Sequence, residues 1–247
     1  MTHLRNIPLL SLLLVAILAT SCRSNRIPSD YSTSEFTTRK SEVVSLLAQA
    51  EERMPDVKTY EAKNSKTKVD FNGNSANIKA NIAFTRGSQT TFTGRIQFPP
   101  VSVGSVEIKG AKASVKSNLL GIDKEMNIPT YFGEAIQCAF LGIVPPVYNL
   151  FGEQDFSHFS MRLTSDCKYV LFRSGASIDI YVYVNAIDFS FSGLHYEAAG
   201  SNADIIVSDY KSFDGLSLPT QVEVVAKQAD GSNGSMSMTI SNPKINK

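Results

Sequence analysis

The chain contains few residues of the types that catalyse reactions or bind metals. Of its three histidines, His3 lies near the start, and His158 and His195 stand alone, with no His-x-x-x-His or Cys-x-x-Cys spacing that would predict a metal site. No Gly-x-Ser-x-Gly motif or phosphate-binding loop is present, and carboxylates such as Asp204 and Asp214 are scattered over predicted turns. We therefore expect no enzyme activity, no metal and no cofactor, although a catalytic site assembled from distant residues stays open.

Cys22 is the residue whose neighbours suggest covalent chemistry. Residues 7–18 carry no charge and follow Arg5, a length typical of a signal-peptide core and short of the ~20 apolar residues that cross a membrane. Ala19-Thr20-Ser21-Cys22 then resembles a lipobox, in which the thiol receives a diacylglyceryl group, with Ala19 where leucine is usual. We predict a lipoprotein signal peptide over residues 1–21 and lipid attachment at Cys22, which would anchor the protein to a membrane. The alternative is an ordinary leader that is cleaved without lipid.

The other two cysteines have two open interpretations. Cys138 and Cys167 would lie in an oxidising compartment, where a disulfide between them would add about 3–4 kcal/mol in the chain-entropy model. They could equally be two separate buried thiols, because cysteine is among the most buried residue types. Neither interpretation makes them reactive nucleophiles.

The bulk composition predicts one domain with its own core. The chain has 247 residues, of which 43% are hydrophobic, and a formal net charge of +1. Because nucleic-acid binding requires a concentrated positive surface, we expect no nucleic-acid partner. Residues 22–33 are polar and contain Pro28, so we predict a flexible tether there and a single domain over residues 34–247.

A helix is predicted directly after the tether. Ser32 and Glu35 fit a capping box, and residues 35–54 follow a helical pattern that Pro55 ends. The apolar residues of this stretch recur at i, i+3, i+4 and i+7 and form one stripe: Val43, Leu46, Leu47 and Ala50. A second, apolar helix is predicted over residues 134–142.

The rest of the chain reads mainly as β-strands. Asn72-Gly73 is a strong hairpin signal, and residues 78–85 and 91–98 alternate between apolar and polar side chains. Repeated hairpins with few helices predict a mainly β (α+β) fold, built on a single strongly curved antiparallel sheet with two or three helices on its concave face. The concave side could be a filled core or a cleft for a long apolar ligand, and the alternation is the same in both cases.

Three segments of the domain resemble those of a known group of proteins. They are "RIQFPPVSVGSVEIKGAKASV" (95–115), "DYKSFDGLSLPTQVEV" (209–224) and "MTISNPKIN" (238–246). Together with the lipobox, tether and Asn-Gly hairpin, they resemble Bacteroidetes lipoproteins that carry an uncharacterised domain related to the LolA/LolB lipoprotein-carrier fold. The resemblance implies a half-barrel of eleven strands whose apolar cavity is capped by helices and holds acyl chains.

The resemblance also suggests site residues. A loop that contacts ligand or membrane would consist of Phe98, Pro99, Pro100, Val101 and Val103, where consecutive prolines stop strand pairing; the alternative is a rigid turn folded back onto the core. Candidates for lining the cavity are Ile82, Phe84, Phe92, Ile96, Phe140, Leu141 and Val144.

Taken together, the leader and the resemblance predict a membrane-anchored lipoprotein of the cell envelope. It would bind acyl chains or other hydrophobic ligands, with lipoprotein cargo as a possible partner in localisation to the outer membrane. We expect a monomer in the outer membrane that faces the periplasm, because no acidic run follows Cys22. The alternative is a structural or accessory lipoprotein that binds a protein partner.

Overall fold

The computed structural model describes most of the predicted domain. The described residues are 40–52, 56–86, 91–98, 101–110, 112–117, 122–127, 130–145, 159–164, 166–174, 178–198, 200–227 and 231–246. They include two helices, α2 (Lys40–Glu52) and α3 (Thr130–Leu141). Within these ranges, no helix combines the length and the apolar content needed to cross a membrane. The predicted signal peptide, tether and Cys22 lie outside them.

Helix α2 presents the predicted apolar stripe to the core. Val43, Leu46 and Ala50 are buried and Leu47 is partly buried, whereas Val44, one position along, is 39% exposed. The predicted helix over residues 35–54 is therefore confirmed for residues 40–52, and its remaining residues lie outside the described ranges.

The strands fall into two runs along the chain. The first run is β1 (Thr59–Phe71), β2 (Asn74–Thr85), β3 (Thr91–Phe98), β4 (Val101–Lys109), β5 (Lys112–Ser117) and β6 (Ile122–Asn127). The second is β7 (Ser160–Leu163), β8 (Lys168–Ser174), β9 (Ile178–Asn185), β10 (Phe191–Ala198), β11 (Ser201–Phe213), β12 (Leu216–Lys227), β13 (Asn233–Thr239) and β14 (Lys244–Asn246).

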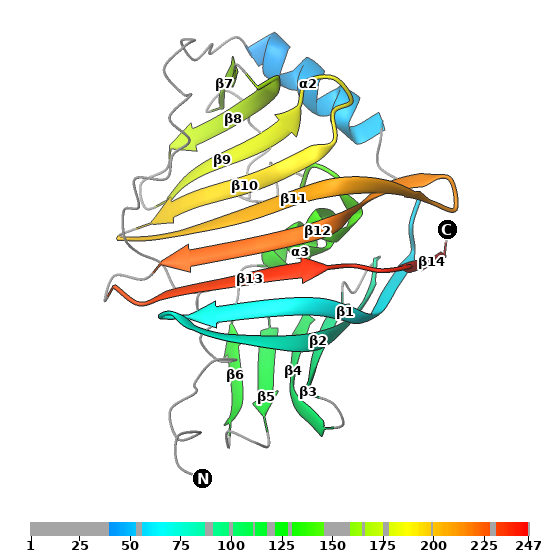
Figure 1. The fold of residues 1–247 in the computed structure, drawn as a ribbon. Coiled ribbons are helices and arrows are strands. Elements are labelled where there is room, and N and C mark those ends of the chain that lie inside the picture. The colour runs from blue at the N-terminus through cyan, green and yellow to red at the C-terminus, as the bar shows by residue number, and fades with distance from the viewer. Residues whose placement is uncertain are drawn as a thin grey trace.

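All these strands form one antiparallel, 14-stranded sheet (Figure 1). From β1 to β6 each strand pairs with the next, so that β6 forms one edge. The second run starts with β7 at the opposite edge and returns strand by strand until β13 pairs with β1. The β1–β13 ladder therefore joins the two halves of the sheet, and β14 pairs with the beginning of β1.

The eleven strands that the resemblance implied are thus an underestimate. β6 has the sequence "IDKEMN", which lacks a clean alternation, yet it pairs with β5 along its whole length. β14 is separated from β13 by Asn242, whose φ of 49° turns the chain away before it pairs with β1. Both strands are specified by their neighbours in the sheet rather than by their own pattern.

The tight turns follow their local chemistry. Asn72 and Gly73 take φ values of 48° and 82° between β1 and β2, and the Gly73 N–H donates to the Asp70 carboxylate at 3.0 Å. Asp214 and Gly215, with φ values of 48° and 79°, connect β11 to β12 in the same way. The predicted Asn-Gly hairpin is confirmed, because Asn and Gly tolerate the left-handed backbone that such turns need.

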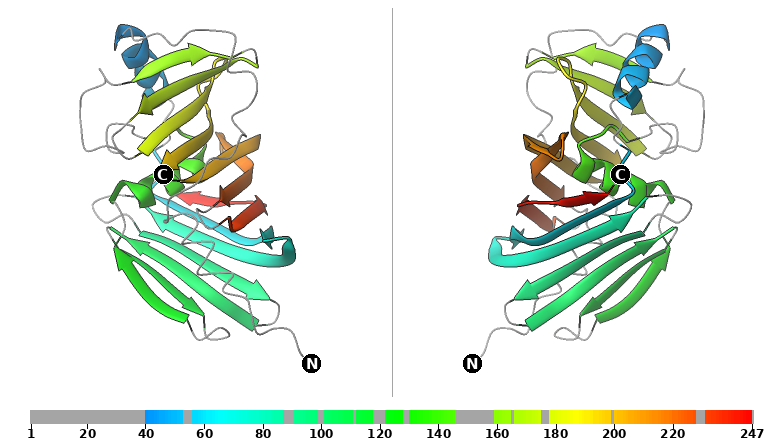
Figure 2. Two further views of the ribbon diagram at one scale, coloured as in Figure 1. Left: turned by 90° about the vertical axis from the view of Figure 1, so that its left-hand side faces the viewer. Right: turned by 90° about the vertical axis from the view of Figure 1, so that its right-hand side faces the viewer.

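Both helices lie on the same side of the sheet (Figure 2). On this inner face Ile82 and Phe84 of β2 are buried, while Ala83 between them and Thr85 after Phe84 are exposed. α3 packs against β12, β11 and β3, and α2 against β7. The predicted mainly β fold with one large antiparallel sheet is confirmed, and the inner side is where the core sits.

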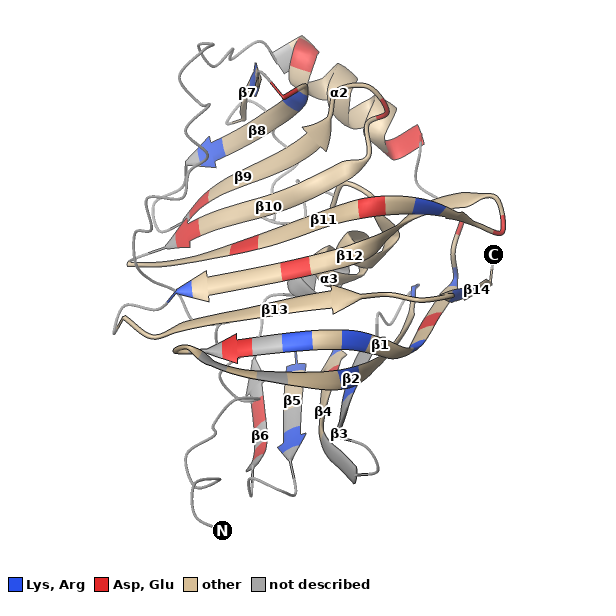
Figure 3. Ribbon diagram, viewed as in Figure 1, with Lys and Arg blue, Asp and Glu red and all other residues tan. Residues whose placement is uncertain are grey.

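The outer face carries charges of both signs. Figure 3 shows basic and acidic residues interspersed along the strands. Lys112 pairs with Glu125 at 2.6 Å and Lys116 with Asp123 at 3.4 Å, and all four side chains are exposed. Such exposed pairs contribute little to stability.

Candidate functional site

The C-terminal end of α3 is built around a glycine in the left-handed region. Gly142 has a φ of 65°. Its N–H donates to the Ala139 carbonyl at 3.3 Å, and the Ile143 N–H donates to the Cys138 carbonyl at 3.1 Å. This pair of hydrogen bonds is a Schellman motif, which satisfies carbonyls that would otherwise lose their partners at a buried helix end.

The same glycine connects α3 to the sheet. Its carbonyl accepts hydrogen bonds from the Phe191 N–H at 3.0 Å and from the Tyr210 hydroxyl at 3.4 Å. The Tyr210 hydroxyl also donates to the Phe191 carbonyl. A Cβ on residue 142 would overlap the Tyr210 ring and lie 2.9 Å from Cδ of Pro219. Only glycine therefore fits between the helix end and the β11–β12 hairpin.

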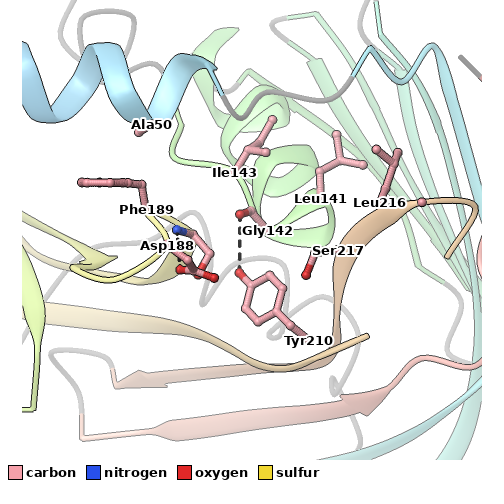
Figure 4. A pocket seen from close by; sticks show the side chains of 11 residues that line it. Ala50, Leu141, Gly142, Ile143, Asp188, Phe189, Tyr210, Leu216 and Ser217 are labelled. Atoms are coloured by element: carbon pink, nitrogen blue, oxygen red, sulfur yellow. Dashed lines mark hydrogen bonds between the residues drawn. The ribbon is translucent and has the colours of Figure 1, made fainter. Parts of the chain in front are cut away.

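A pocket of about 160 Å³ lies at this junction (Figure 4). Four elements border it: α2, the end of α3, the turn between β9 and β10, and the β11–β12 hairpin. Its lining residues are Ala50, Leu141, Gly142, Ile143, Asp188, Phe189, Ser190, Tyr210, Gly215, Leu216 and Ser217. The pocket thus lies between the two helices and the turns that connect β9 to β10 and β11 to β12.

The pocket has apolar and polar lining residues, and the apolar Phe189 and Leu216 come from the turn and the hairpin. The helices contribute Ala50, Leu141 and Ile143. The turn contributes Asp188, whose carboxylate accepts hydrogen bonds from the Ser190 N–H at 3.0 Å and hydroxyl at 2.7 Å. Burial, and next the nearby Asp188 charge, raise the pKa of Tyr210, so its phenol stays neutral. Such a lining suits an apolar group with a polar end.

A second, more open hollow of about 400 Å³ lies where β14, β1 and β2 run side by side. It is lined by Thr59, Tyr60, Glu61, Ala83, Phe84, Thr85, Lys244 and Asn246. The polar residues in this set come from strand positions that alternate with the buried Tyr60 and Phe84.

A buried titratable group lies elsewhere, in the β9–β11 part of the sheet. His195 is 3% exposed; its Nδ1 is 2.6 Å from the Asp204 carboxylate, and its Nε2 is 3.4 Å from that of Glu197. Burial lowers the pKa of His195, but the hydrogen bonds and charges of Asp204 and Glu197 outweigh burial and raise it overall. No group of side chains suited to a metal ion occurs among the described residues.

Five of the seven predicted cavity-lining residues come together in the core. Ile82, Phe84, Phe140, Leu141 and Val144 are all buried in one hydrophobic cluster. Of these, Leu141 lines the pocket between the helices, whereas the Phe84 side chain points into the core, away from the outward-facing residues of the second hollow. Phe92 and Ile96 lie in β3, but their side chains are outside the described part of the structure.

The predicted ligand or membrane loop overlaps a strand hairpin. Phe98, at the end of β3, pairs with Val101, at the start of β4, and Val103 lies within β4. Pro99 and Pro100 lie outside the described residues. The structure does not describe the side chains of Phe98, Val101 and Val103. The exposure that we predict for this loop therefore stays a prediction.

The two cysteines of the domain are not joined. Cys138 is buried in α3, and Cys167 is exposed in the turn before β8. The structure therefore agrees with the interpretation of two separate thiols. That interpretation expected both to be buried, and this is true of Cys138 but not of Cys167.

The sequence did not single out Tyr210, Asp188 or Ser217 as site residues. Tyr210 and Ser217 fall within the segment 209–224 that carried the resemblance. The sequence did contain a signal for the end of α3, because Gly142 directly follows an apolar helix and glycine is typical of a helix C-terminus. The partner of that glycine is 68 residues away along the chain, and no local pattern indicates it.

Comparison with known proteins identifies the fold. No protein-family model and no curated protein match the chain. A DUF1329 family protein from Desulfovibrio piger matches over 85% of this chain and 94% of its own, with 10% identity and a TM-score of 0.56. A putative outer membrane lipoprotein-sorting protein domain from Vibrio parahaemolyticus matches over 84% and 94%, with 8% identity and a TM-score of 0.55.

A LolA superfamily protein from Nitrosomonas europaea is also similar, over 83% of this chain and 93% of its own, with 12% identity and a TM-score of 0.48. At these identities the likeness concerns the fold alone. The expected LolA/LolB-like fold is supported, whereas membership of the Bacteroidetes lipoproteins stays a prediction.

Proposed function

We propose that this protein binds acyl chains or other hydrophobic ligands between its helices and the inner face of its sheet. The observation that carries the proposal is the pocket between α2 and the end of α3, which faces the buried inner side of the sheet. The helices contribute Ala50, Leu141 and Ile143 to its wall, so a ligand in the pocket contacts apolar surface on that side. We further propose that the sheet acts as a half-barrel whose concave side is this inner face.

The volume of the pocket limits how much of an acyl chain it can hold. At about 160 Å³ it is close to an engineered cavity that binds benzene, so it can take roughly six carbons. At about 0.8 kcal/mol per buried methylene these contribute roughly 5 kcal/mol. A complete acyl chain requires more room, and movement of α2 away from α3 would provide it, because Ala50 of α2 forms one wall.

The fold supports the same proposal at a coarser level. One structure with this fold is described as a putative outer membrane lipoprotein-sorting protein domain. An argument from fold to function is an analogy, so we transfer only the class of ligand, which is hydrophobic, and the compartment, which is the cell envelope.

A single-tryptophan experiment tests the proposal, because the chain has no tryptophan. The mature chain, residues 22–247 with Cys22→Ala, would carry either Ser217→Trp at the pocket or Ser208→Trp as a matched control. Both serines are exposed on neighbouring strands, and only Ser217 lines the pocket. We expect a brominated fatty acid to quench the fluorescence at position 217 strongly and that at 208 little. Equal or absent quenching would contradict acyl binding and favour the protein-partner alternative.

Membrane anchoring through Cys22 is a separate part of the proposal. A diacylated or triacylated cysteine would hold the protein on a membrane without a spanning helix. We expect Cys22→Ala to move the protein from the membrane fraction to the soluble fraction after cell lysis. If the variant stays in the membrane fraction, the lipid anchor is refuted, while ligand binding can still be measured independently.

A further inference from the structure

The inner face of β1 carries hydroxyl groups within the core. Tyr60, Ser65 and Thr67 are all at most 3% exposed, although a bulge shifts the register between Ala62 and Ser65. The Thr67 hydroxyl donates to the Ser65 carbonyl at 3.2 Å. The Tyr60 and Ser65 hydroxyls, by contrast, have no hydrogen-bond partner among the described residues.

Tyr60 is the larger and more constrained of these two residues. Its ring stacks on Phe84 of β2 with centroids 4.7 Å apart and an angle of 5°, and it lies 6.0 Å from the Phe140 ring of α3. Only 1% of Tyr60 is exposed, so its hydroxyl is held in place among apolar rings. Burial strongly raises the pKa of this phenol, which keeps it a hydrogen-bond donor.

The molecule offers a direct comparison in Tyr210. That phenol is also largely removed from water, but it donates to the backbone carbonyls of Gly142, at the end of α3, and of Phe191, at the start of β10. A buried hydroxyl without a partner is destabilising, and such groups are rare in folded proteins. Tyr60 therefore needs an acceptor that the described residues do not supply.

The surroundings of Tyr60 connect it to the pocket between the helices. Phe140, whose ring faces Tyr60, is followed by Leu141 and Gly142, which line that pocket. The hollow of about 400 Å³ beside β14 lies on the opposite, outward face of these strands, because its other lining residues alternate with Tyr60 and Phe84, so it gives no access to the Tyr60 hydroxyl. A chain that enters at the pocket and displaces Phe140 would reach the Tyr60 hydroxyl.

We propose that the Tyr60 hydroxyl donates a hydrogen bond to the carbonyl oxygen of a bound acyl group. The inference rests on the proposed function and adds a polar specificity to it: the preferred ligand is an acyl compound, either a free fatty acid or an ester, rather than a plain hydrocarbon. Ser65 is the weaker candidate for this donor, because Tyr60 packs against Phe140 of α3, the residue that precedes Leu141 in the pocket lining.

The test compares ligands of equal length on the mature chain, residues 22–247 with Cys22→Ala. Dodecane, methyl dodecanoate and dodecanoic acid would compete with a fluorescent fatty acid. We expect the protein to prefer the ester or the acid over the alkane, and Tyr60→Phe to reduce that preference about tenfold, as expected for one hydrogen bond. The affinity for dodecane should not change. Binding of the ester alone would indicate an esterified lipid, and binding of the acid as well would indicate a free fatty acid.

Two further variants serve as controls for the role of the Tyr60 hydroxyl. Ser65→Ala removes the other unpartnered hydroxyl of β1 and should leave the ligand preference intact. In the ligand-free protein, Tyr60→Phe should keep or raise the midpoint of urea unfolding, whereas Tyr210→Phe should lower it, because only Tyr210 loses hydrogen bonds to its own chain.

Each result has a distinct meaning. A lower unfolding midpoint for Tyr60→Phe would overturn the inference, since the hydroxyl would then have a partner inside the protein. An unchanged ligand preference in Tyr60→Phe would also overturn it, while the proposed function would stand. If the unsubstituted protein binds none of the three compounds, both the proposed function and the inference fail.

Discussion

At the scale of the residue, His195 is the group whose surroundings define a response to pH. Its imidazole is buried between the carboxylates of Asp204 and Glu197, and its ring centroid lies 5.5 Å from that of Tyr181. The pKa of His195 in the folded protein lies above the ordinary value of 6.5. The protonated form is therefore bound more favourably by the folded state than by the unfolded state.

The sign of the pH effect follows from that shift. The stabilisation by protonated His195 is fully present below about pH 6.5, its unfolded pKa, and is lost as the pH rises through the higher folded pKa. We expect the unfolding midpoint of the original protein, relative to His195→Gln, to be higher at about pH 5.5 than at about pH 8.5. Urea denaturation at the two pH values measures this difference. A difference that grows with pH would contradict the raised pKa.

At the scale of the element, the end of α3 depends on Gly142. Alanine there would have to adopt a φ of 65° and would also overlap Tyr210 and Pro219. Gly73 provides a matched control, because its φ is 82° but a Cβ at that position would have no other atom within 4 Å. Gly73→Ala therefore carries only the backbone strain, which is of order 1–3 kcal/mol.

We expect Gly142→Ala to lower the free energy of unfolding by more than Gly73→Ala, with a further loss of about 1–3 kcal/mol from overpacking. Urea denaturation of the two variants beside the original protein measures both losses. If the two substitutions lower the free energy of unfolding equally, the packing of Tyr210 and Pro219 on Gly142 does not contribute the predicted additional loss of stability.

At the scale of the whole molecule, the β1–β13 ladder joins the two halves of the sheet. Opening this ladder would split the sheet at its centre, whereas loss of β6 or β7 removes only one neighbour at an edge. We expect backbone amides of β1 and β13 to exchange hydrogen most slowly and those of β6 and β7 first. Hydrogen exchange followed by mass spectrometry of peptides measures this order. Exchange in β1 as fast as in β6 would contradict the role of the ladder.

The sequence by itself determined the features that depend on a few consecutive residues. The stripe of Val43, Leu46 and Ala50 identified a helix with one buried face, the alternation around Ile82 and Phe84 identified a strand, and Asn72-Gly73 identified a hairpin. Each of these signals arises from side-chain direction or backbone preference within one or two turns of chain, so it can be read locally.

Only the tertiary structure decided which distant segments meet. The pairing of Lys66 with Thr239, the contact of Gly142 with Tyr210 and the separation of Cys138 from Cys167 have no local signature. Strand order and helix placement minimise the free energy of the whole chain, and an alternating strand fits many neighbours equally well. For the same reason the unpartnered hydroxyl of Tyr60 emerged only once the residues packed around it were known.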